Sequence, residues 1–157
     1  MLFRSIQGDY RIGGYAVKSD GMLRGVIDEY GPPTSKRRRW GRVGCLVGWR
    51  GAGLSILFYN LGGGDACRPD DGRFRTAAMT GRLWVTAKGL RVGDSVARLR
   101  RLYPGATYHA SGHYPRSWWL VTRYSRIGDN GYYPGLRAIV RNGRVGSFVI
   151  EYAAGGD

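Results

Sequence analysis

The sequence predicts an α+β protein in which two tandem helix-plus-antiparallel-hairpin repeats form one curved antiparallel sheet with helices packed on one face. Three observations indicate this class. The 27 glycines among 157 residues favour turns and strands over long helices. Two short segments carry apolar residues at helical spacing, and matching apolar strand segments follow each of them. We expect a single domain over residues 6–157, with repeats at about 6–80 and 81–157.

The first predicted helix contains Leu23, Val26, Ile27 and Tyr30 at helical spacing, and Gly31-Pro32-Pro33 ends it. The second predicted helix begins at a cap formed by Asp94 or Ser95. Its apolar stripe is Val96, Leu99, Leu102 and Tyr103, and Pro104-Gly105 ends it. Tyr30 and Tyr103 therefore close equivalent turns.

Three predicted strands follow each helix at corresponding positions. Segment 45–50 corresponds to 118–123, segment 54–60 to 136–142, and segment 72–79 to 143–150. In the second copy, Asn142-Gly143 joins two strands directly, and this dipeptide is a strong hairpin signal because both residues tolerate positive φ. The first copy instead inserts a loop rich in glycine and aspartate, from Leu61 to Asp71.

A two-residue turn fixes which side chains share a face of the hairpin. One predicted face is small and apolar, suited to lie under a helix: Leu136, Ala138, Val140, Val145, Ser147 and Val149. The other mixes cations with large apolar groups: Arg137, Ile139, Arg141, Arg144, Phe148 and Ile150. Arginine and aromatic residues are enriched where interfaces carry binding energy. We therefore expect a binding site at Tyr59, Arg137, Arg141, Arg144 and Phe148, with Trp119 or Trp40 at its edge.

Cys45 and Cys67 are the only cysteines, and the loop that holds Cys67 returns toward the strand that holds Cys45. A disulfide is the first interpretation, and it would place the mature protein outside the cytosol, in the extracellular space or cell envelope. Two buried free thiols, which would allow a cytoplasmic protein, are the alternative. A zinc site is less favoured because structural zinc takes four ligands.

The formal net charge is +14, and all of the 25 basic residues except Lys18, Lys36 and Lys88 are arginine. GC-rich coding produces this skew without a selected partner, so net charge alone indicates only non-specific attraction to polyanions. The densest cluster is Lys36, Arg37, Arg38, Arg39, Trp40 and Arg42, between the first helix and the first strand. Its ordinary interpretation is a solvated loop, and its alternative is a nucleic-acid or polyanion site with Trp40 as a stacking ring.

Motifs for catalysis are weak in this sequence. His109 and His113 have metal-ligand spacing only on a helix, and their glycine- and proline-containing context indicates an aromatic surface loop. Asp94 and Ser95 lie at a helix start, where capping explains them. Only Glu29 and Glu151 are glutamates, which leaves little material for paired-carboxylate chemistry. We expect no catalytic residues, no metal and no cofactor, with an unrecognised hydrolase using Asp94, His109 or His113 as an alternative.

The first residues carry no signal-peptide pattern, and no stretch is long and apolar enough for a membrane span. Leu2-Phe3-Arg4-Ser5 matches the translation of a short sequencing adapter. We therefore expect residues 1–5 to be a non-native leader and the signal peptide to be missing from this sequence.

The glycine-bounded lead into the second helix, Gly89-Leu90-Arg91-Val92-Gly93-Asp94-Ser95-Val96, resembles that of the β-lactamase inhibitory protein family. The tandem organisation and the cysteine pair within one repeat are also similar to this family, over nearly the whole chain. The resemblance implies a curved antiparallel sheet with helices behind it and a concave face that grips partners. This chain departs from the family in having no cysteine pair in its second repeat, and no inhibitory loop residue matches. The expected function is an exported, non-enzymatic interaction module for an unknown protein partner.

Overall fold

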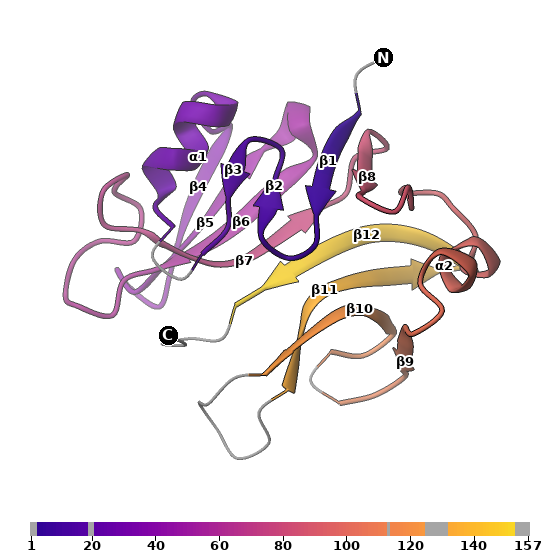
Figure 1. Ribbon diagram of the computed structural model, residues 1–157. Coiled ribbons are helices and arrows are strands. Elements are labelled where there is room, and N and C mark those ends of the chain that lie inside the picture. Colours follow the sequence, from indigo (N-terminus) through magenta and orange to yellow (C-terminus); the bar gives the residue numbers. More distant parts are fainter. Residues whose placement is uncertain (1–2, 19–20, 113, 125–131, 153–157) are drawn as a thin grey trace.

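The computed structural model describes residues 3–18, 21–112, 114–124 and 132–152. These residues form an α+β fold with two α-helices and mostly antiparallel strands (Figure 1). The helices are α1 (Leu23–Tyr30) and α2 (Val96–Leu102), and a short 3-10 turn, η1 (Arg50–Ala52), links two strands. Both predicted helices are confirmed.

Eight strands form one large antiparallel sheet. From one edge to the other they are β4 (Ser35–Arg39), β5 (Gly44–Trp49), β6 (Leu54–Tyr59), β7 (Arg73–Met79), β12 (Arg144–Glu151), β11 (Tyr132–Arg141), β10 (Ser117–Tyr124) and β9 (Thr107–His109). Each run of four strands is a meander, and the two meanders meet where β7 pairs with β12.

A second, four-stranded sheet was not predicted. Its order is β3 (Tyr15–Ala16), β2 (Arg11–Ile12), β1 (Arg4–Gln7) and β8 (Trp84–Thr86), and β1 pairs with β8 in parallel. The expectation of a single sheet was therefore wrong. The strands of this sheet have two to four residues, too few to show a hydrophobic period, so the sequence pattern did not reveal them.

The core lies between the large sheet and a layer made of the small sheet and the two helices (Figure 1). Every second residue of the central strands points into it, as Val47, Ile56 and Ala77 do on β5, β6 and β7. Ile6, Leu23, Trp84 and Leu99 cover them from the other layer, and all four are fully buried. The opposite face of the large sheet, here called the free face, is covered by neither the small sheet nor the helices.

Local signals set the ends of both helices. Gly31 takes φ 80° and its N–H donates to the Ile27 carbonyl, so glycine ends α1 in a conformation unfavourable to other residues. Ser95 caps α2, and its hydroxyl accepts a hydrogen bond from the Arg98 N–H. The capping function expected of Asp94 or Ser95 thus belongs to Ser95.

The hairpin between β11 and β12 turns at Asn142 and Gly143, both at positive φ, as expected. Its register then shifts, because Val140 lies opposite Val145 whereas Ile139 lies opposite Ser147. Gly146 is an extra residue on β12, so every later side chain of that strand changes face. Phe148 is consequently buried against the core and not on the free face where it was predicted.

Candidate binding face

The free face carries the side chains that alternate with the core residues. Its strands contribute ten large side chains, most of them arginine or aromatic: Arg37, Arg39, Leu46, Leu57, Tyr59, Arg75, Glu151, Arg137, Trp119 and His109. Trp40 and Tyr114 join them from loops beside the sheet. The face therefore mixes arginine with aromatic rings from edge to edge.

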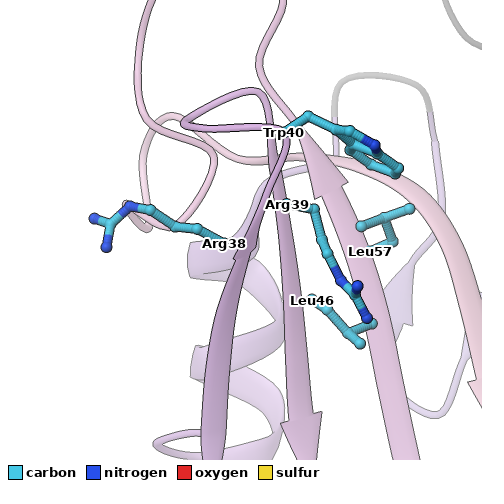
Figure 2. Close-up of a pocket in the computed structure, with 5 residues that line it drawn as sticks. All are labelled: Arg38, Arg39, Trp40, Leu46 and Leu57. Atoms are coloured by element: carbon cyan, nitrogen blue, oxygen red, sulfur yellow. The ribbon is translucent and has the colours of Figure 1, made fainter.

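A shallow cavity of about 560 Å³ lies at the β4 to β6 end of the free face. Figure 2 shows Arg39 extending beside Leu46 and Leu57, with Trp40 above them and Arg38 pointing away. Trp40 is 64% exposed, and its ring meets Tyr59 edge to face at 5.7 Å between centroids. The ring lies over Gly44, where a Cβ atom would come within 2.8 Å of it.

The arginine run is strand β4 and not the loop that the sequence suggested. Strand alternation divides its cations between the two faces. Lys36 donates to the Cys67 carbonyl at 2.9 Å, and Arg38 pairs with Asp65 at 2.7 Å. Both therefore hold the inserted loop, and only Arg37 and Arg39 remain on the free face. Arg42, in the turn after β4, is exposed.

That loop is fastened to β5 by a disulfide, which confirms the predicted pairing of Cys45 with Cys67. Asp65 is only 5% exposed, and it accepts hydrogen bonds from the Arg38 guanidinium and the Cys67 N–H. These two donors lower the pKa of Asp65 below its ordinary value. The side chain of Asn60 bonds Gly62, Gly64 and Asp71, so the loop also has an internal scaffold.

Near the centre of the free face, one carboxylate lies among two arginines and a tyrosine. Arg75 Nη2 is 3.7 Å from Glu151 Oε1, and the Arg137 guanidinium lies 4.9 Å from the centre of the Tyr114 ring. Tyr114 also shares a side-chain hydrogen bond with Glu151. Burial raises the pKa of Glu151 against the opposing effect of the two arginines, and burial lowers the pKa of Arg137.

The β9 to β10 end of the free face is aromatic. His109 and Trp119 stack with their ring centres 3.8 Å apart, and Tyr114 meets Trp119 edge to face at 6.0 Å. Trp119 lies directly opposite Arg137 on the neighbouring strand. Rings and guanidinium therefore form one packed group.

Three N–H groups of this region are buried and have no hydrogen-bond acceptor within the described parts of the chain: Arg75 Nη1, Arg137 Nε and Trp119 Nε1. A buried donor without an acceptor costs about 1–3 kcal/mol. All three atoms belong to side chains of the free face, on β7, β11 and β10. The free face thus holds three buried donors without an acceptor.

Three of the predicted binding residues, Tyr59, Arg137 and Trp119, lie on the free face, where Trp119 is directly opposite Arg137 and Tyr59 contacts Arg75. Arg141 is exposed near the hairpin turn, whereas Arg144 reaches back to the Gly93 carbonyl at 3.0 Å beside α2. The alternation of the sequence also predicts Arg75 on this face, although not among the site residues, and it did not point to Glu151 or Tyr114. Arg75 lies at a register shift between β6 and β7.

The hydrolase residues have other roles where they are described. Asp94 accepts from the Arg91 N–H and pairs with Arg98 at 3.1 Å, which explains it as part of the lead into α2. His109 ends β9 and stacks on Trp119, while His113 lies outside the described residues. Within the described ranges, His, Cys, Asp and Glu form no group of three that is placed to hold a metal ion.

No described helix is both long and apolar enough to span a membrane. No family model, no curated protein and no solved structure matches this chain.

Proposed function

We propose that this protein is an exported, non-enzymatic interaction module that binds another protein through the free face of its large sheet. The observation that carries the proposal is the set of arginine and aromatic side chains on this face from Trp40 to His109. Residues of these two kinds contribute most of the binding energy in protein interfaces. The Cys45–Cys67 disulfide supports export, because such bonds persist in oxidising compartments.

The strand order also supports two tandem repeats, over about 6–80 and 81–157. Counted outward from the centre, the sheet is β7-β6-β5-β4 on one side and β12-β11-β10-β9 on the other, and each meander follows its own helix. This arrangement is what the resemblance to the β-lactamase inhibitory protein family implies. In such a layout both copies contribute strands to one binding face.

The polyanion alternative has less support. A nucleic-acid strand needs a row of cations beside open ring faces. Here Lys36 and Arg38 contact the inserted loop. The cations of the run that remain for a polyanion are Arg37, Arg39 and Arg42. Trp40 remains exposed beside them.

Photo-crosslinking tests the proposal. A photoreactive phenylalanine analogue replaces Tyr59 or Trp119 on the free face, and Tyr10 or Leu61 serves as the control because each is exposed elsewhere. The variants are mixed with secreted and envelope proteins of the native host. We expect both free-face positions to give the same saturable protein adduct and the controls to give none. Equal adducts from all four positions, or no protein adduct, would overturn the proposal.

A further inference from the structure

The free face lacks hydrogen-bond acceptors at one place. The three unpartnered donors of Arg75, Arg137 and Trp119 come from neighbouring parts of the sheet, and Trp119 is directly opposite Arg137. Buried polar groups in native proteins normally have partners, and exceptions gather where a water, an ion or a ligand belongs. All three missing partners are acceptors.

Charge is also unbalanced at the same place. Arg75 and Arg137 share a single carboxylate, that of Glu151, whose side chain is 14% exposed. Arg75 itself is 20% exposed, so neither charge of this pair is fully solvated. A second anionic group beside Glu151 would match both the charge and the missing acceptors.

We infer that the partner presents an acidic protein segment to this face, with an aspartate or glutamate carboxylate received by Arg75, Arg137 and the Trp119 indole N–H. The inference rests on the proposed function and names the chemistry of its partner. Since the three donors are covered in the free protein, the side chains that cover them must move when the carboxylate enters. The ring of Tyr114 lies over one of them, Arg137.

A protein segment fits this face better than a nucleic acid does. The row that leads from Trp119 and Arg137 to the other end of the face begins at the buried Val149 and continues with the small residues Ala78, Ser55, Gly48 and Ser35. This row, beside the arginine and aromatic groups, suits side-chain packing and contains no cation for a phosphate. One face of the Trp119 ring is already occupied by His109 at 3.8 Å, which leaves less ring surface for a nucleic-acid base.

The test follows the donors themselves by ¹⁵N NMR of the whole protein. A short poly-glutamate peptide is titrated in, and poly-glutamine of equal length and oligothymidylate of equal charge are titrated separately. We expect poly-glutamate alone to shift the Trp119 indole and Arg137 Nε signals saturably. If oligothymidylate shifts these signals at lower concentration, the occupant is a nucleic acid and the inference is wrong.

Matched variants distinguish a specific carboxylate site from general electrostatic attraction between the basic protein and poly-glutamate. Trp119→Phe keeps an aromatic ring but removes the indole N–H, and Arg137→Gln removes the charge; each is expected to weaken poly-glutamate binding about tenfold. Arg82→Gln removes an exposed cation from the segment between β7 and β8 and should change binding less than twofold. Equal losses in Arg137→Gln and Arg82→Gln would show that only net charge matters and would overturn the inference. Trp119→Phe keeps the test valid if Arg137→Gln fails to fold.

Failure of the acidic-segment inference can be distinguished from failure of the proposed function. If poly-glutamate leaves the donor signals unchanged while Tyr59 and Trp119 still crosslink to a protein, the face binds a partner that is not acidic there. If crosslinking also fails, the free face is not a docking surface.

Discussion

At the scale of single residues, one ion pair with a buried carboxylate joins distant parts of the chain. Asp9 lies in the turn between β1 and β2 and is 1% exposed, and it pairs with Arg123 on β10 through both carboxylate oxygens. The pair raises the pKa of Arg123 above its ordinary value, chiefly through the hydrogen bond from Arg123 to Asp9. It thereby fastens the small sheet to the second meander.

Removing the arginine should leave a buried carboxylate without a partner. We expect Arg123→Met to lower the free energy of unfolding by about 2–3 kcal/mol, measured by urea denaturation. Arg82→Met, at an exposed arginine, should change it by less than about 0.5 kcal/mol. Adding Asp9→Asn to Arg123→Met should restore part of the loss. If Arg123→Met and Arg82→Met have the same free energy of unfolding, the Asp9–Arg123 pair does not stabilise the fold.

At the scale of elements, the extra residue Gly146 decides which side chains of β12 enter the core. Without Gly146, Val145 would be followed directly by Ser147, and simple alternation would still place Phe148 and Ile150, both fully buried, on the core face. We therefore expect the variant that lacks Gly146 to keep cooperative thermal unfolding, as seen by near-UV circular dichroism. Gly146→Ala should also fold normally, because its Cβ would lie 3.6 Å from the Ile139 carbonyl oxygen, an ordinary contact. Loss of cooperative unfolding in the deletion variant, with Gly146→Ala folding normally, would refute this explanation of the register.

The inserted loop is held to β5 by the Cys45–Cys67 disulfide, and the stability of the fold should depend on this bond. Cys45 and Cys67 are 22 residues apart, and closing a loop of this size stabilises the fold by about 3 kcal/mol in the chain-entropy model. We expect the Cys45→Ala/Cys67→Ala double variant to lose about that much in urea denaturation. Reductant should lower the stability of the wild type to the same level and leave the variant unchanged. An effect of reductant on the variant would mean that another process is being measured.

At the scale of the whole molecule, the +14 charge should cause weak and non-specific attraction to polyanions. Binding to oligothymidylate should fall roughly 50-fold between 50 and 200 mM salt if about four phosphates are contacted. Arg37→Gln/Arg39→Gln should weaken it as much as Arg100→Gln/Arg101→Gln at the end of α2 does, because only charge is removed. Fluorescence anisotropy measures both pairs. A much larger loss in the β4 pair would instead support a dedicated polyanion site there.

Local signals explain what the sequence predicted correctly. Glycine and serine at the helix ends, the Asn142-Gly143 turn and the returning cysteine loop each act over a few residues or a single covalent bond. Strand β4 escaped prediction because an edge strand with all its residues exposed has no hydrophobic alternation. The small sheet escaped because its strands are too short to show a period.

The sequence by itself therefore determined the two helices, the hairpin at Asn142-Gly143 and the Cys45–Cys67 disulfide. It also showed that arginine and aromatic residues are frequent in the strand segments. Only the tertiary structure decided which of those residues share the free face. Phe148 moved to the core because one extra residue at Gly146 reverses the alternation, and Arg75, Glu151 and Tyr114 came together from β7, β12 and a loop. Register shifts and pairings between distant strands depend on how the whole sheet packs, and no local pattern encodes them.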